Sequence, residues 1–212
     1  MVGVMTRILL VSGSTRDGSL HTAALRTAAR SAPADVTATL YGGLRDLPAF
    51  VPGEQPWSEP VAILRQEVTA ADAMLFSTPE YAGSLPGSLK NLLDWLVDGG
   101  ELDGKPVAWL SVVAPGKDEG ALATLQTTLE HGSARVLRSA CIRIPLSLEA
   151  VDAHGIVEDP RLHLALQDML RAFTWSLAVA QEARRQPSWQ AYSSVYPVVL
   201  RPDRSAFGRG RS

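Results

Sequence analysis

Three runs of nearly continuous apolar residues are separated by segments with the spacing of amphipathic helices. The runs cover residues 7–11, 72–78 and 106–113. Strands buried on both faces have this composition, and they occur mainly in parallel sheets whose two faces are covered by helices. This feature restricts the chain to an α/β fold more strongly than any other feature of the sequence.

Two further runs, residues 36–41 and 135–144, alternate apolar and polar positions and are therefore expected as edge strands. Helical periodicity or composition predicts helices between the strands and after Pro160. Five strands whose second and fifth members lie at the edges match the doubly wound order 2-1-3-4-5. In such sheets, ligands bind beyond the carboxyl ends of strands one and three, which here lead into residues 12–19 and 78–86.

The composition fits a soluble globular domain. The 212 residues are 46% hydrophobic and 20% charged, and the net charge of −2 disfavours a nucleic-acid surface, which carries a basic excess. Cys141 is the only cysteine, so the sequence requires no oxidising compartment. The first apolar run is too short for a secretory signal, and no run is long enough to span a membrane. We therefore expect a cytoplasmic protein that binds neither nucleic acid nor membrane.

The loop SGSTRDGSLH, residues 12–21, suits a phosphate group. Its hydroxyl groups and Arg16 can donate hydrogen bonds, and the following helix adds free N–H groups at its positive end. The loop lacks the lysine of a P-loop and the G-x-G-x-x-G pattern of dinucleotide sites, which disfavours a nucleotide hydrolase. This loop alone permits two interpretations, a site for a phosphate monoester or a polar turn that caps a helix.

The second loop leads into a helix and reads TPEYAGSLPGSLKNLLDWL, residues 78–96. Pro79 and Pro86 stiffen it, while Gly83 and Gly87 allow close approach of the backbone. Because this loop follows strand three, we expect it to face the first loop across the carboxyl edge of the sheet. An exposed Tyr81 would then stand beside the phosphate site.

Together the two loops resemble those of the NADPH-dependent FMN reductase family, flavodoxin-like flavoproteins that include quinone, azo-dye and chromate reductases. The family pattern P-E-Y-N-x-S-x-P-G-x-L-K-N-x-x-D-W is similar to PEYAGSLPGSLKNLLDW, with Ala82 in place of the first asparagine. The pattern G-S-x-R-x-x-S-x-N is similar to GSTRDGSLH, with His21 in place of the last asparagine. The resemblance covers about residues 7–182 and implies a flavodoxin-like fold.

The resemblance also implies which residues bind FMN, in three groups that belong to three loops. The candidates are Ser14, Arg16, Ser19, His21 and Thr22 for the phosphate, Pro79, Glu80, Tyr81, Ala82, Gly83 and Ser84 for the isoalloxazine ring, and Gly116 in the loop after strand four. Near Gly116, residues 117–119 are expected as a solvated turn and helix start. We expect neither a catalytic side chain nor a metal.

The activity implied by the resemblance is that of an NAD(P)H oxidoreductase. FMN would take a hydride at N5 from NADPH or NADH and pass it in a ping-pong cycle to a small acceptor, such as a quinone, a flavin, an azo compound or a pathway-specific substrate. The family also implies a homodimer or homotetramer. The alternative is a flavodoxin-type electron carrier for a protein partner, although such carriers usually have a strong acidic excess.

The C-terminal residues are expected to lie outside the flavin-binding domain. We expect residues 1–185 to form the domain and residues 186–212 to form a basic extension. Two interpretations of this extension stay open, a flexible tail and an arm that contacts another subunit.

Overall fold

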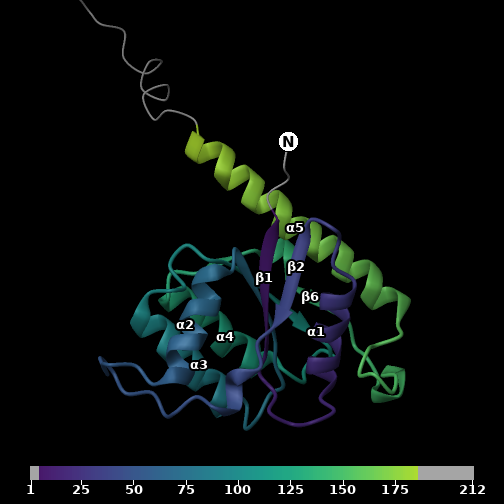
Figure 1. Ribbon diagram of the computed structural model, residues 1–212. Coiled ribbons are helices and arrows are strands. Elements are labelled where there is room, and N and C mark those ends of the chain that lie inside the picture. The colour runs from purple at the N-terminus through teal and green to yellow at the C-terminus, as the bar shows by residue number, and fades with distance from the viewer. Residues whose placement is uncertain (1–4, 186–212) are drawn as a thin grey trace, which may run out of the picture. The chain divides into compact units, whose positions relative to one another are not determined.

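The computed structural model describes residues 5–185, and its strands form a parallel sheet (Figure 1). The strand order is β2-β1-β3-β4-β5, and a short β6 also pairs with β4, so the predicted order is confirmed. The strands are β1 (Thr6–Ser12), β2 (Val36–Leu40), β3 (Ala73–Ser77), β4 (Pro106–Ser111), β5 (Arg135–Val136) and β6 (Ile142–Arg143).

The predicted edge strand of residues 135–144 is interrupted. Val107 of β4 pairs with Val136, and Leu110 pairs with Ile142, so residues 108–109 of β4 lie opposite residues 137–141. The extra residues form a 3₁₀ turn (Arg138–Ala140), which buries the Ala140 side chain completely. The prediction of one continuous strand was wrong because the alternation of apolar and polar residues breaks at this turn, where the polar Arg138 and Ser139 are adjacent.

Within residues 5–185, five α-helices connect or follow the strands, and they cover both faces of the sheet (Figure 1). Side chains of α2, α3 and α4 share one apolar cluster with Leu9, Met74 and Val107, whereas those of α1 and α5 share a second cluster with Ile8 and Leu75. Successive strand residues therefore point to opposite layers, as the period of two requires. The helices are α1 (Leu20–Arg30), α2 (Glu59–Ala70), α3 (Gly87–Gly99), α4 (Glu119–His131) and α5 (Pro160–Arg185).

The long connection between β2 and α2 is held against α3 by residues of the second sequence motif. The Asn91 side chain accepts a hydrogen bond from the Phe50 N–H (2.7 Å) and donates one to the Pro48 carbonyl (2.8 Å). Trp95 donates to the same carbonyl (3.1 Å), and its ring lies edge-on to Phe50 with centroids 5.0 Å apart. Asn91 and Trp95 of the K-N-x-x-D-W part of the motif thus hold this loop on α3.

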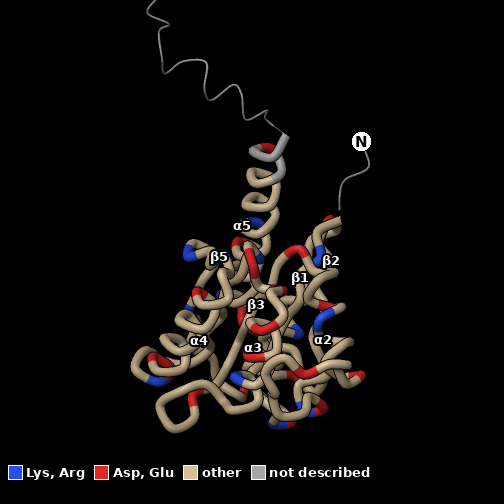
Figure 2. The backbone as a smooth tube through the Cα atoms, turned by 90° about the vertical axis from the view of Figure 1, so that its left-hand side faces the viewer, with Lys and Arg blue, Asp and Glu red and all other residues tan. Residues whose placement is uncertain are grey.

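By its contacts, the chain divides into residues 1–177 and residues 178–212. Both apolar clusters belong to the first unit, and the described part of the second unit is the end of α5. Acidic and basic positions are both scattered over the described chain (Figure 2). Among the described residues, no helix has the length and apolar character that crossing a membrane requires.

Candidate functional site

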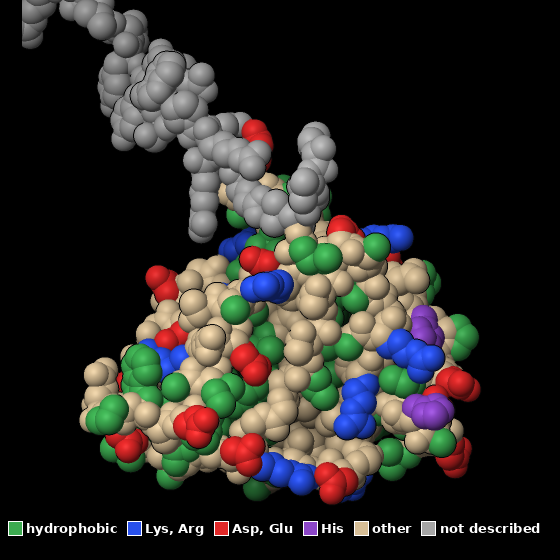
Figure 3. Space-filling model, viewed as in Figure 1, with side chains coloured by type: hydrophobic (Ala, Val, Ile, Leu, Met, Phe, Trp, Pro, Cys, Tyr) green, Lys and Arg blue, Asp and Glu red, His purple; other side chains and the backbone are tan. Residues whose placement is uncertain are grey.

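A polar pocket of about 430 Å³ lies beyond the end of β1, between residues 12–19 and the segment that follows β2. The loop after β1 lies at the lower edge of Figure 1, and side chains of both charges gather along this edge in Figure 3. The structure places three predicted phosphate residues on the pocket wall, with other donors around them. These wall residues are Ser14, Arg16 and Thr22, together with Thr15, Arg26 and Arg45.

The donor set of this pocket fits a phosphate monoester. Hydroxyl, N–H and guanidinium groups surround the space, and the N-terminus of α1 opens beside it. Among the wall residues, the carboxylate of Asp17 is highly exposed and forms an ion pair with Arg45 (2.9 Å). Gly18 has a φ of 67°, a left-handed conformation that glycine adopts without strain and that turns the loop back toward α1.

Contact between the first two loops is close because Gly13 has no side chain. A Cβ atom at Gly13 would overlap the Thr78 side chain, which follows β3. The Gly13 N–H also donates to the Ser77 carbonyl (2.8 Å), which extends the pairing of β1 and β3 beyond the strands. The phosphate loop and the second loop are thus neighbours at the carboxyl edge, as the topology predicts.

Two of the predicted phosphate residues lie apart from the pocket wall. Ser19 is buried at the N-cap of α1, although its side chain makes no capping hydrogen bond. The His21 imidazole is also buried, and its Nδ1 lies 3.0 Å from the Ser77 hydroxyl. That hydroxyl donates its only hydrogen to the Leu110 carbonyl (2.7 Å), so His21 Nδ1 must carry the proton that joins the pair.

The protonation state of His21 follows from its burial. Burial lowers the pKa of the imidazole to about 4, so the ring is neutral near neutral pH. With the proton on Nδ1, the remaining nitrogen, Nε2, is a hydrogen-bond acceptor and not a donor. A neutral His21 of this tautomer keeps no ring N–H free for a phosphate, and its part in phosphate binding stays a prediction.

The second loop contains a tight two-residue turn at its tip. Tyr81 and Ser84 exchange backbone hydrogen bonds of 2.9 and 3.0 Å, and both residues between them have positive φ, 51° at Ala82 and 73° at Gly83. These are the features of a type I′ turn, which prefers Asn-Gly. The residues of this tip, Tyr81 to Gly83, are exposed, and the Tyr81 side chain is 53% exposed.

The base of the second loop is fastened to the start of α4. The Glu80 carboxylate accepts a hydrogen bond from the Ala121 N–H (3.0 Å), and the Ser84 hydroxyl lies 3.2 Å from that of Thr124. A Cβ at Gly120 would overlap the Gly83 carbonyl, so the absence of a side chain there permits the contact. Glu80 therefore serves as a cap for α4, whose free N–H groups attract a carboxylate.

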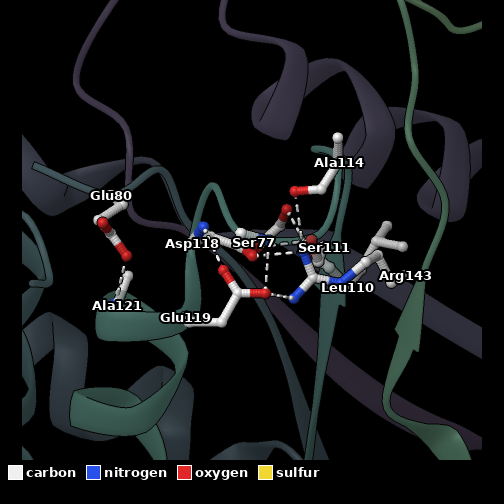
Figure 4. A network of polar contacts seen from close by, with 10 residues as sticks. Ser77, Glu80, Leu110, Ser111, Ala114, Asp118, Glu119, Ala121 and Arg143 are labelled. Atoms are coloured by element: carbon white, nitrogen blue, oxygen red, sulfur yellow. Dashed lines mark hydrogen bonds and ion pairs between the residues drawn. The ribbon is translucent and has the colours of Figure 1, made fainter. Parts of the chain in front are cut away.

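The third loop, which joins β4 to α4, carries Gly116 at an exposed position with a φ of 83°. Its N–H donates to the Glu119 carboxylate (2.7 Å), which lowers the Glu119 pKa. Asp118 is completely buried, so the expectation that it forms part of a solvated turn is wrong. Figure 4 shows its side chain beside those of Ser111, Arg143 and Glu119.

Sequence reasoning missed the part of the phosphate pocket that comes from the segment after β2. Tyr41 and Arg45 line the pocket opposite the first loop, and Arg26 reaches it from α1. The sequence did contain a signal for Tyr41 and Arg45, because the predicted strand order puts the carboxyl end of β2 beside that of β1. Among the described residues, no group of His, Cys, Asp and Glu side chains could hold a metal ion.

Comparison with known proteins identifies a family and several relatives. A sequence profile of the family described as NADPH-dependent FMN reductase matches residues 6–144. The chain is 33% identical to the NAD(P)H-dependent FMN reductase of Pseudomonas aeruginosa over 172 residues, which is 78% of this chain and 92% of that relative. It is 34% identical to the quinone reductase of Escherichia coli over 106 residues, which is 48% of this chain and 56% of that enzyme.

A solved structure supports the same assignment. The flavoenzyme FerB of Paracoccus denitrificans, an NAD(P)H:(acceptor) oxidoreductase, superposes with a TM-score of 0.70 and 27% identity, covering 82% of this chain and 97% of FerB. The profile match spans the strands and loops that build the site. On these grounds the chain belongs to the NADPH-dependent FMN reductase family.

Proposed function

We propose that the three loops at the carboxyl edge of the sheet hold FMN, with its phosphate in the pocket beyond β1. As a family member, the chain is an FMN-dependent NAD(P)H oxidoreductase. The main support for placing the FMN phosphate here is the pocket of hydroxyl and guanidinium groups at the N-terminus of α1. This pocket lies directly beside the loop with the second motif. The flavodoxin-type carrier is the less supported reading.

At the phosphate end, the loop of residues 12–19 supplies the donors. The Arg16 guanidinium pairs with the phosphate, and the hydroxyl groups of Ser14 and Thr22 together with the first N–H groups of α1 donate hydrogen bonds. Ser12 keeps Thr22 in place, since their hydroxyl oxygens lie 2.8 Å apart. Ser19 contributes through its backbone, and His21 supports the loop from beneath through Ser77.

At the ring end, the second loop offers backbone groups rather than reactive side chains. Pro79, the turn at Ala82 and Gly83, and the exposed ring of Tyr81 border the flavin, while Glu80 and Ser84 hold this loop on α4. Ala82 offers no side-chain hydrogen bond, so the contact at this position comes from the main chain. Gly116 approaches the cofactor from the third loop through its backbone.

When bound, FMN would accept a hydride from NADPH or NADH and deliver it to a second small molecule. The chain positions the cofactor, leaves one side open for the two substrates in turn, and needs no nucleophile or acid–base pair. We propose a quinone or a comparable small electron acceptor as the second substrate, supported by the quinone reductase named among the relatives.

We further propose that the chain forms homodimers or homotetramers and works in the cytoplasm. Support for assembly comes from large apolar side chains that the described part of one chain leaves exposed, such as Val51, Trp57 and Ile63 on and before α2. The need for NAD(P)H as reductant supports the location. The division into a flavin-binding domain of residues 1–185 and an extension of residues 186–212 belongs to the same proposal.

The absorbance spectrum of the purified protein tests the proposal. We expect flavin bands that NADPH or NADH bleaches in the absence of oxygen, and steady quinone turnover without a second protein. An Arg16→Ala variant is expected to bind FMN at least tenfold more weakly, whereas Arg161→Ala, which removes an exposed arginine far along the chain, retains full affinity. A protein that cannot be reconstituted with FMN would contradict the proposal, and turnover that requires a partner protein would favour the carrier.

A further inference from the structure

Two side chains from neighbouring strands converge on one buried carboxylate. Ser111 ends β4, and Arg143 ends β6 as its direct partner in the parallel register. The Ser111 hydroxyl donates to Asp118 Oδ2 (2.5 Å), while Arg143 Nη1 forms an ion pair with Asp118 Oδ1 (2.6 Å). Asp118 is completely buried and the Arg143 side chain is 20% exposed, so water screens this pair poorly.

The same guanidinium also holds both ends of the loop that joins β4 to α4. Nη1 donates to the Ala114 carbonyl (3.2 Å), and Nη2 contacts the Glu119 carboxylate (3.3 Å). Glu119 in turn accepts hydrogen bonds from the N–H groups of Gly116 (2.7 Å) and Asp118 (3.2 Å). Figure 4 shows these groups converging from β4, β6 and the start of α4, so one arginine braces the loop.

The insertion in the edge strand explains how Arg143 comes to this place. Residues 137–141 lie opposite only residues 108–109 of β4, and pairing resumes at Leu110 with Ile142. Without the 3₁₀ turn, a continuous strand would place a residue earlier in the sequence opposite Ser111. The turn therefore sets the register that brings a guanidinium, rather than the side chain of Ala140, to the buried carboxylate.

We propose that Arg143 and Asp118 are positioning residues that fix the β4–α4 loop for binding of FMN. The inference rests on the proposed function, because it takes the exposed backbone of this loop, Gly116 included, as a wall of the cofactor site. Neither side chain contacts the cofactor. The pair acts through the loop, and it acts on the second loop as well, since Glu80 and Ser84 are fastened to the same helix start.

Two variants separate this role from a general contribution to stability. Arg143→Gln leaves a buried, unpaired carboxylate and is expected to lower the melting temperature. The double variant Asp118→Asn with Arg143→Gln removes that charge, so we expect it to recover most of the lost thermal stability. The double variant still lacks the guanidinium that contacts Ala114, Asp118 and Glu119. We therefore expect its FMN affinity to stay at least tenfold below that of the wild type.

The measurements are FMN titration by quenching of flavin fluorescence, thermal unfolding, and hydrogen exchange of residues 112–118 in the flavin-free protein. Faster exchange confined to this loop in the double variant supports the proposal. Arg138→Gln is the control, because Arg138 lies on the same edge segment and forms an exposed pair with Glu130 (3.6 Å). We expect it to change none of the three readouts.

Recovery of FMN affinity together with thermal stability in the double variant would overturn the positioning role. Unchanged exchange of residues 112–118 would overturn it too, even in a protein that binds FMN. A wild-type protein that binds no FMN would instead refute the proposed function. The exchange measurement then still decides whether Arg143 braces the loop, so the two failures are distinguishable.

Discussion

Ala82 stands at a backbone conformation that disfavours alanine. Its φ of 51° places Cβ near the following carbonyl, an arrangement that asparagine tolerates better because its side chain can bond the local backbone. The family pattern has asparagine here, and the type I′ turn gives the physical reason. We therefore predict that Ala82→Asn raises the free energy of unfolding by roughly 0.5–1 kcal/mol, as measured by urea denaturation.

A helical alanine serves as the control for this substitution. Ala123 lies on the exposed side of α4, where asparagine is expected to lower stability by about 0.5 kcal/mol through its poorer helix propensity. Opposite signs for the two variants would support the turn as the cause. A loss of stability in Ala82→Asn would show that the turn does not impose the strain that its dihedral angles indicate.

His21 makes stability depend on pH. Its pKa falls from 6.5 in the unfolded chain to about 4 in the folded protein, so protonation favours unfolding. Stability is fully present above pH 6.5 and falls until the pH is below about 4, by about 3 kcal/mol for this shift. We predict that His21→Asn flattens this part of the pH profile, as followed by chemical denaturation between pH 4 and 7.

The exposed His131 supplies the matched control, since His131→Asn is expected to leave the profile as in the wild type. An equally steep profile in His21→Asn would mean that other groups cause the acid sensitivity. At the residue scale, the resemblance proposed His21 as a phosphate ligand because it stands at the position of the family's asparagine. It could not foresee Ser77, which is distant in sequence and fixes the tautomer only after the sheet forms.

At the scale of elements, the buried strands were the easiest to predict and the edge was the hardest. Continuous apolar runs revealed β1, β3 and β4, because burial on both faces leaves a clear composition. The 3₁₀ turn at Arg138 is marked only by a short break in the alternation at residues 136–142, which does not show how far the register shifts. The burial of Asp118 escaped prediction for a similar reason, because its partner Arg143 comes from another element and becomes its neighbour only through strand pairing.

The contact between the second loop and α4 depends on Gly120. A methyl group there would overlap the Gly83 carbonyl, so Gly120→Ala must push the loop from the helix. We predict a loss of about 1–3 kcal/mol in the free energy of unfolding, with weaker FMN binding, measured by denaturation and flavin titration. Gly87→Ala is the control, because a Cβ at the first residue of α3 meets open space. Similar effects of both variants would contradict this cause.

The long β2–α2 loop depends on Asn91. Replacement by alanine leaves the Phe50 N–H and the Pro48 carbonyl without this partner, although Trp95 still binds the latter. We predict that Asn91→Ala costs about 2 kcal/mol and speeds proteolysis within residues 46–58. Lys90→Ala removes only a partly exposed i,i+4 ion pair on the same helix and should cost under about 0.5 kcal/mol. Unchanged proteolysis in Asn91→Ala would assign the fastening of the loop to Trp95 alone.

At the scale of the whole molecule, the described core lies within residues 8–173. The buried hydrophobic residues begin at Ile8 and end at Phe173, and they fill both layers between the sheet and its helices. The residues proposed to bind FMN fall inside the same span, so folding and cofactor binding depend on one continuous stretch of the chain. The predicted C-terminal extension lies outside the described residues, and its role stays a prediction.

Truncation decides between the two interpretations of that extension. A chain that ends at Arg185 retains the whole described core, so we predict an unchanged melting temperature within about 2 °C and an unchanged FMN affinity. Calorimetry, flavin titration and light scattering would measure stability, binding and assembly separately. If only the subunit number falls, residues 186–212 form an arm between subunits. If FMN affinity falls as well, the arm also shapes the site, and the boundary proposed at residue 185 is wrong.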